Sequence, residues 1–197
     1  MESIYTKQKL LTKDYKRAYS TNEGHYAGFK MTLAIDERTY KPLAILIHPG
    51  SPHDTKIFDD MLVELKKRRI LKKGQVILAD RGFQSLKNYL IGINKYKVVP
   101  LLFPKKKPSL ITLIERIQNP IEYFTEEEYK NPIYNYLKEK LFILLTKWED
   151  YRRRRGKIEE FFKFLKIQLK LKQIHAYTKK ICLQTRLSEC TFNGNYD

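Results

Sequence analysis

Apolar and polar positions along the first hundred residues predict short strands that alternate with helices. Residues 28–36 alternate apolar with polar side chains, and residues 43–48 are apolar on both faces. We therefore expect an antiparallel hairpin whose second strand is buried. Two further apolar strands are predicted at 75–80 and 96–103, with a short helix at 85–93 between them.

A longer helix is predicted after the hairpin, at 51–69. Ser51 offers a capping hydroxyl, Pro52 a first-turn proline, and Asp54 an acid near the positive end of the helix. His53 lies in the same turn. For His53 we favour a structural role, fixing the turn, over a functional one.

The ends of the chain and its middle segment follow other patterns. Residues 1–27 are polar and basic without a sustained period, so we expect a strand remnant followed by a basic loop. Residues 108–150 carry spaced prolines and are expected to form an insertion that contains a helix at 133–148. One amphipathic helix is predicted at 151–171, and residues 172–197 form a C-terminal segment and tail. The apolar stripe of that helix consists of Ile158, Phe161, Phe162, Leu165 and Leu169.

The order of these elements predicts the fold class. A hairpin, a helix, a strand, a helix, a strand, an insertion and a long helix together indicate an α/β fold, with helices packed on a mixed sheet. A chain of 197 residues suits one domain with an inserted segment.

Charge narrows the class of partner. The chain has 39 Lys and Arg against 22 Asp and Glu, a net charge of +17. This excess favours a polyanion, nucleic acid first and an anionic membrane second, and a merely lysine-rich proteome would supply matching Glu. No stretch approaches the roughly 18 apolar residues of a membrane span. Cys182 and Cys190 fit no zinc pattern with His175, so we expect a reducing, cytoplasmic compartment.

Two acidic residues are candidates for metal chemistry. Asp80 ends a predicted buried strand, and chemistry collects at the carboxyl ends of strands in open α/β sheets. Glu159 lies within roughly 40° of Arg155 and Lys166 on one edge of the last helix. Asp80 capping the next helix, and Glu159 pairing with Arg155, are the structural alternatives. If the two carboxylates converge, they can hold Mg²⁺ through oxygen for phosphoryl transfer on nucleic acid.

Four stretches resemble the catalytic domain of DDE-type transposases from bacterial and archaeal insertion sequences. The resemblance spans residues 28–167 and is specific in the combination of the last two stretches. They are GFKMTLAID, HPGSPHDTKIF, ILADRGF and RGKIEEFFKFLK. The resemblance implies a ribonuclease H-like mixed sheet with flanking helices, and a helical insertion at about 108–150 before the last catalytic helix. It also implies a catalytic domain at 1–171.

The resemblance assigns roles to residues of the last helix and to the strand-end acid. Asp80 resembles the second catalytic Asp of the family, and Glu159 resembles the catalytic Glu. The family's Tyr, Arg, Glu, Lys pattern places its Arg and Lys on Arg155 and Lys166, which would contact DNA phosphates. Its Tyr position falls on Arg152, with Tyr151 displaced by one residue; both are DNA-binding candidates.

The family's first catalytic Asp is the main departure. The nearest match is Glu2, in Glu2-Ser3-Ile4, which makes Glu2 the third candidate catalytic residue and metal ligand. Asp36 is a poor substitute, because it ends a strand antiparallel to the family's first strand. We expect an N-terminally truncated copy with impaired activity.

The resulting expectation is a metal-dependent transposase that cleaves and joins DNA for an insertion sequence. It would use two Mg²⁺ or Mn²⁺ ions on double-stranded insertion-sequence ends, as a possible homodimer in a prokaryotic, nucleoid-associated setting without a membrane partner. A non-catalytic basic DNA-binding protein derived from a transposase and a metal-dependent nuclease of the same fold remain alternatives. The first Asp position discriminates the transposase from the non-catalytic DNA-binding protein.

Overall fold

The fold is described from a computed structural model. It describes residues 16–20, 24–50, 52–102, 112–113, 115–117, 131–154 and 156–168. The chain divides into two compact units, each described by itself below. Among the described residues, the first unit holds 34–44 and 53–158, and the second holds the remainder. Within this part of the chain, no helix is long and apolar enough to cross a bilayer.

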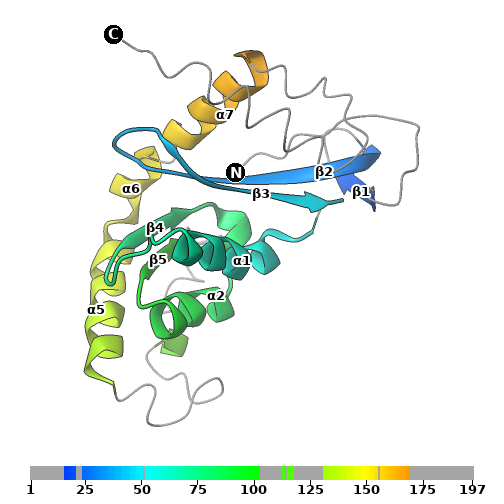
Figure 1. The fold of residues 1–197 in the computed structure, drawn as a ribbon. Coiled ribbons are helices and arrows are strands. Elements are labelled where there is room, and N and C mark those ends of the chain that lie inside the picture. Colours follow the sequence, from blue (N-terminus) through cyan, green and yellow to red (C-terminus); the bar gives the residue numbers. More distant parts are fainter. Residues whose placement is uncertain are drawn as a thin grey trace. The chain divides into compact units, whose positions relative to one another are not determined.

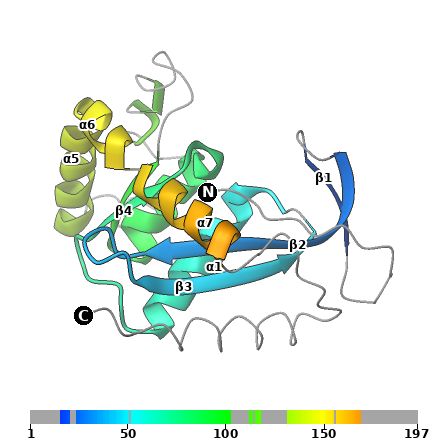
Figure 2. The same cartoon turned by 90° about the horizontal axis from the view of Figure 1, so that it is seen from above.

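A three-stranded sheet has the order β1-β2-β3. Its strands are β1 (Lys16–Ser20), β2 (Gly24–Ile35) and β3 (Pro42–Pro49). β1 pairs antiparallel with β2 and places Ser20 opposite Gly24. Figure 2 shows β2 and β3 side by side and running in opposite directions. The predicted hairpin is therefore confirmed, but its second strand is only partly buried, with Ala44 and Ile47 as its buried residues.

The expectation of a basic loop before residue 28 was wrong. Residues 16–20 and 24–27 are strand, and each satisfies its backbone groups on the other. This segment lacks the apolar alternation that predicts a strand. Its strands are recognised from the pairing of their backbones.

The polar positions of β2 are also buried. Lys30 and Thr32 are only 5% and 2% exposed, although they alternate with apolar neighbours. The Lys30 ammonium donates a hydrogen bond to the Pro52 carbonyl at 2.9 Å, within the second unit. Burial of an ammonium requires such partners.

Asp36 organises the turn between β2 and β3. Its Oδ1 accepts hydrogen bonds from the Arg38 and Thr39 amides at 2.9 and 2.8 Å. The Asp36 amide donates to the Lys41 carbonyl at 2.9 Å. Hydrogen bonds from Thr39, and then from Arg38, lower the pKa of Asp36. Asp36 is thus a turn residue.

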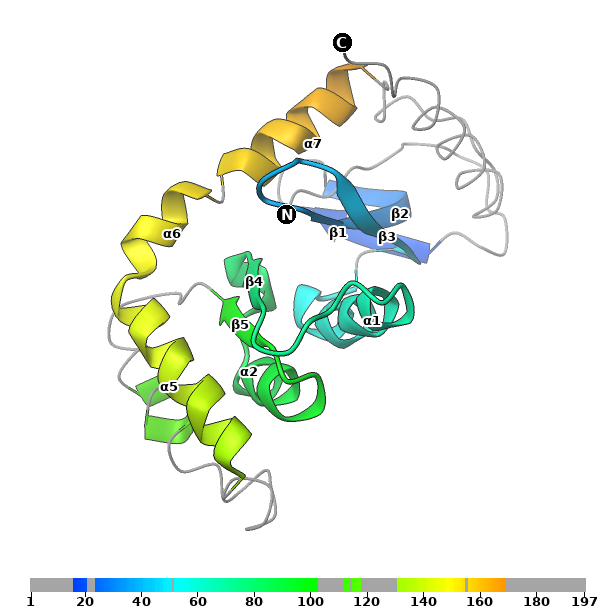
Figure 3. The ribbon, with the colours of Figure 1, turned by 60° about the vertical axis from the view of Figure 1, so that its left-hand side comes forward.

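The first unit is built on two parallel strands, β4 (Val76–Ala79) and β5 (Val99–Leu102). Helix α1 (Asp54–Lys67) precedes β4, and α2 (Leu86–Leu90) lies between the strands in the chain. A π-helical turn, Ile91–Lys95, extends α2. Figures 1 and 3 show α1 and α2 beside this strand pair. The chain therefore has a mixed α/β architecture.

Helix α1 begins two residues later than its proline suggested. His53 is the N-cap: its side chain accepts from the Thr55 amide at 3.3 Å, and its Nδ1 lies 2.8 Å from the Thr55 hydroxyl. The structural role predicted for His53 is confirmed. Pro52 precedes the helix instead of lying in its first turn, and Ser51 lies outside the described residues. The imidazole takes the place predicted for the serine hydroxyl.

Helix α5 (Pro132–Thr146) packs against β5 and belongs to the core of the first unit. Asn131 caps it, and its Oδ1 accepts from the Ile133 amide at 2.9 Å. The Tyr134 hydroxyl donates to the Ile117 carbonyl at 3.1 Å, and burial raises the pKa of Tyr134 to about 12. The Tyr89 hydroxyl donates a hydrogen bond to the Leu102 carbonyl within this core. Side chains with no exposed surface in the core include Leu62, Tyr89, Ile93, Leu101, Leu102, Leu137 and Leu141.

The span predicted as one helix, 151–171, is helical on both sides of Arg155. Helix α6 covers Trp148–Arg154 and α7 covers Gly156–Gln168. Arg155 and residues 169–171 lie outside the described residues. Phe162 on the predicted apolar stripe is fully buried.

Candidate active site

Asp80 lies directly after β4, at the carboxyl end of the strand. Its Oδ1 accepts a hydrogen bond from the Arg81 amide at 2.7 Å, and its carbonyl accepts from the Phe83 amide at 3.0 Å. Asp80 thereby caps the 3-10 turn Arg81–Phe83. The capping alternative is confirmed only in part, because Asp80 caps this short turn while Ser85 caps the helix predicted at 85–93. Capping is compatible with a metal role because a carboxylate offers about four lone-pair sites.

A buried amide ties this turn to the start of α1. Asn88 is 2% exposed, and its Nδ2 donates to the Phe83 carbonyl at 2.8 Å and to the Thr55 carbonyl at 3.0 Å. The Phe58 ring packs on Phe83, with the ring centroids 6.4 Å apart. The turn that carries Asp80 is therefore anchored by both hydrogen bonding and packing.

Gly82 allows the same turn to approach α1 closely. A Cβ at position 82 would lie 2.3 Å from Oδ2 of Asp54, the first residue of α1. Any side chain at 82 must displace the Asp54 carboxylate. The two motifs ILADRGF and HPGSPHDTKIF thus meet at this contact.

We expect a Gly82→Ala variant to lose about 1–3 kcal/mol of unfolding free energy, the usual cost of overpacking. In an Asp54→Ala background the same substitution should cost less, because the atom that clashes has been removed. Urea unfolding of the parent, both single variants and the double variant gives the coupling energy, expected at about 1 kcal/mol or more. Additive costs would show that Gly82 and Asp54 do not constrain each other.

Glu159 lies in the first turn of α7, and its side chain is exposed. Asp80 belongs to the first unit and Glu159 to the second, so their convergence stays a prediction. The predicted partners Arg155 and Glu2 lie outside the described residues, as does the side chain of Lys166.

Part of the arginine run contacts the β2–β3 turn. Arg154 stacks on the Tyr151 ring, with its guanidinium carbon 4.8 Å from the ring centroid, and pairs with Glu37 at 3.4 Å. Tyr151 is half-buried, whereas the Arg152 side chain lies outside the described residues. Lys157 lies over the Tyr40 ring, with its ammonium 5.2 Å from the ring centroid.

Sequence reasoning missed these contacts for a physical reason. Arg154 and Lys157 lie about 117 residues after the residues they contact, Glu37 and Tyr40. Glu37 and Tyr40 belong to a polar connector whose sequence has no apolar period. It missed Asn88 as well, since a single Asn in a short helix resembles a solvated residue. The glycine of ILADRGF was the one available signal of close packing.

Carboxylate oxygens are the ligands that hard divalent cations prefer, so Asp80 suits a metal site. Within the described ranges, no three His, Cys, Asp or Glu residues gather as a metal-binding group. A metal site that includes Asp80 therefore stays a prediction.

Comparison with known proteins identifies the family. No curated protein and no solved structure matches the chain. The family model described as transposase DDE domain matches residues 3–180, which is most of the 197 residues. The chain belongs to the DDE transposase domain family.

Proposed function

We propose that this chain is the catalytic domain of an insertion-sequence transposase that cleaves DNA and joins the cut ends to a new site. The family match over residues 3–180 carries this proposal. The anchored position of Asp80 at the carboxyl end of β4 supports it, because chemistry collects at that edge in α/β sheets.

Asp80 and Glu159 are proposed as two carboxylates of the active site, with Glu2 as the third. Members of this family typically use divalent metal ions, and here we propose two Mg²⁺ or Mn²⁺ ions. When bound, such a pair activates a water or a 3′-hydroxyl and stabilises the leaving oxygen at a phosphodiester. The hydrogen bond from the Arg81 amide and the Asn88 anchor hold Asp80 in position. Glu2 is one methylene longer than the family's Asp, which lowers the expected rate.

The DNA contacts are proposed on the last helices. Arg152, Arg155 and Lys166 would neutralise backbone phosphates of the DNA, and Tyr151 would contact the DNA beside these cations. The net charge of +17 supports double-stranded DNA as the substrate. That the bound DNA is the ends of the element follows from the proposed transposase function alone. A homodimer would bring two such ends together.

The finer fold assignment is also a proposal. The mixed α/β order of a hairpin, α1, β4, α2, β5 and α5 is consistent with a ribonuclease H-like domain over 1–171. The insertion would cover about 108–150, and residues 172–197 would follow as a C-terminal segment.

The test is a product analysis on duplex DNA that carries the element's own ends, with Mg²⁺, with Mn²⁺ and with EDTA. Metal-dependent nicking together with strand-transfer products would support the transposase. Metal-dependent cleavage without joining would instead indicate a nuclease of the same family. DNA binding without either product would leave a non-catalytic DNA-binding protein.

A further inference from the structure

A dense group of cations lies in the last turn of α1 and in the segment directly after it. Between Glu64 and Gln75 the chain carries six exposed cationic side chains. They are Lys66, Lys67, Arg68, Arg69, Lys72 and Lys73. Arg68 pairs with Glu64 at 2.7 Å, and the other five have no acidic partner within the described part of the chain.

These cations lie at the edge of the β4–β5 pair opposite to Asp80. The strands are parallel, so their amino ends share one edge and their carboxyl ends share the other. The Gly74 amide donates to the Lys97 carbonyl at 2.8 Å, which brings Lys97 beside the residues that precede β4. From Gly74 to Asp80 an extended chain covers roughly 20 Å. This surface is therefore separate from the candidate active site.

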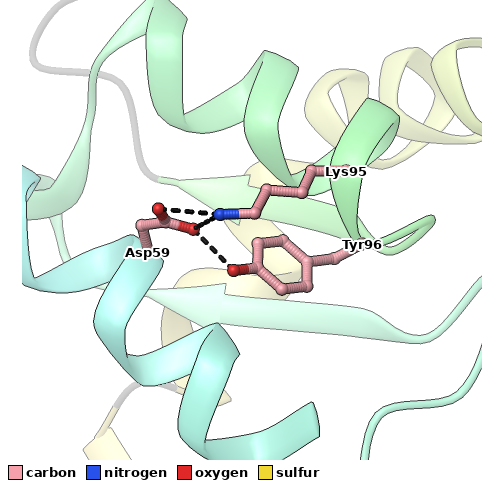
Figure 4. Close-up of polar contacts among 3 residues, drawn as sticks. All are labelled: Asp59, Lys95 and Tyr96. Atoms are coloured by element: carbon pink, nitrogen blue, oxygen red, sulfur yellow. Dashed lines mark hydrogen bonds and ion pairs between the residues drawn. The ribbon is translucent and has the colours of Figure 1, made fainter.

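One nearby acid, Asp59, is already paired with a cation. Figure 4 shows Asp59 accepting hydrogen bonds from Lys95 at 2.9 and 3.0 Å and from the Tyr96 hydroxyl at 2.6 Å. Burial acts to raise the pKa of Asp59, but the hydrogen bonds from Tyr96 and Lys95 and the charge of Lys95 outweigh it and lower the pKa. Lys66 lies on Tyr96, with its ammonium 6.0 Å from the ring centroid. Charge beside this surface is thus mainly uncompensated and positive.

Two of these cations occupy backbone conformations that favour glycine. Arg69 has φ 59° and Lys97 has φ 56°. Arg69 follows the C-cap of α1, where its amide donates to the Lys66 carbonyl at 2.9 Å and the Ile70 amide donates to the Leu65 carbonyl at 3.0 Å. Glycine is the usual residue at this position of such a helix end. The backbone conformation favours glycine at both positions, so it does not explain why an arginine and a lysine occupy them.

We propose that Lys66, Lys67, Arg69, Lys72, Lys73 and Lys97, here called the basic edge, bind the backbone phosphates of duplex DNA. This second DNA contact extends the proposed transposase function and rests on it. The basic edge would hold a stretch of DNA away from the phosphodiester at Asp80, without reading its sequence.

The decisive variant is Arg69→Gly with Lys97→Gly, which removes two charges where glycine suits the backbone. We expect its thermal unfolding midpoint to equal or exceed that of the parent chain. Its Kd for a fluorescent random-sequence duplex at low salt should rise about tenfold, and the slope of log affinity against log salt should fall by about two. A structural role for the two side chains predicts no such change in slope.

A second variant, Lys72→Gln with Lys73→Gln, should change the slope in the same way at exposed positions. The matched control is Lys41→Gln with Lys147→Gln, which removes the same charge from exposed sites outside the basic edge. Parent-like slopes for both basic-edge variants, or an equal loss in the control, would overturn the proposal. Failure of metal-dependent cleavage with basic-edge binding intact would overturn the catalytic proposal and leave the DNA contact standing.

Discussion

An Asp80→Asn variant is expected to lose metal-dependent DNA cleavage by a factor of at least about 10³, because it removes a charged ligand of the proposed metal site. The substitution removes the charge of Asp80 but keeps its capping hydrogen bond. The Asn amide oxygen can still accept the hydrogen bond from the Arg81 amide, so the turn that follows β4 keeps its cap. The loss should therefore appear in the rate and in the Mg²⁺ concentration for half-maximal rate, with little change in unfolding midpoint.

The chain offers matched controls for this prediction. Asp60→Asn changes an exposed acid of α1, and Glu160→Gln changes the exposed neighbour of Glu159. Glu159→Gln should lose activity to a similar degree as Asp80→Asn, while both controls retain it. If Asp80→Asn cuts DNA at the parent rate, Asp80 is only a helix cap and the catalytic proposal fails.

Replacing Leu141 by Ala is expected to reduce the unfolding free energy by about 2–5 kcal/mol. Leu141 has no exposed surface and lies in α5, which packs on β5. Loss of its side-chain atoms leaves a cavity that the surrounding helix and strand fill only in part. Urea denaturation monitored by circular dichroism measures the change in midpoint and slope.

Ile143→Ala is the control for this second prediction. Ile143 is 59% exposed on the same helix, so its removal should cost less than about 0.5 kcal/mol beyond the small change in helix propensity. Equal costs for the two variants would show that α5 does not form part of the core of the first unit in solution.

Elements with a clear apolar period were predicted well from the sequence. The hairpin of β2 and β3, strand β4 with Asp80 at its end, and helix α5 follow directly from alternation, apolar runs and spaced leucines. Asp80 was also identifiable as a candidate, since its position at a strand end depends only on local pattern.

Features that depend on pairing without a side-chain pattern were not predicted, whether the partner is near in the chain, as for β1, or distant, as for Asn88. Strand β1 exists through backbone pairing with β2, and no side-chain pattern reports it. The anchor of the Asp80 turn depends on Asn88 reaching Thr55, 33 residues away.

The place of α5 in the core has a consequence for how the protein is made. Strands β4 and β5 and the helix between them occupy residues 76–102 and leave the ribosome before α5, which begins at Pro132. Lys140 of α5 then donates to the Gly74 carbonyl, a contact that spans 66 residues. Until translation reaches α5, nascent chains expose the apolar side chains of β5 that the helix later covers. Slow elongation between β5 and α5 therefore prolongs this exposure and favours association between unfinished copies, and a chaperone that covers the exposed side chains favours the folded chain.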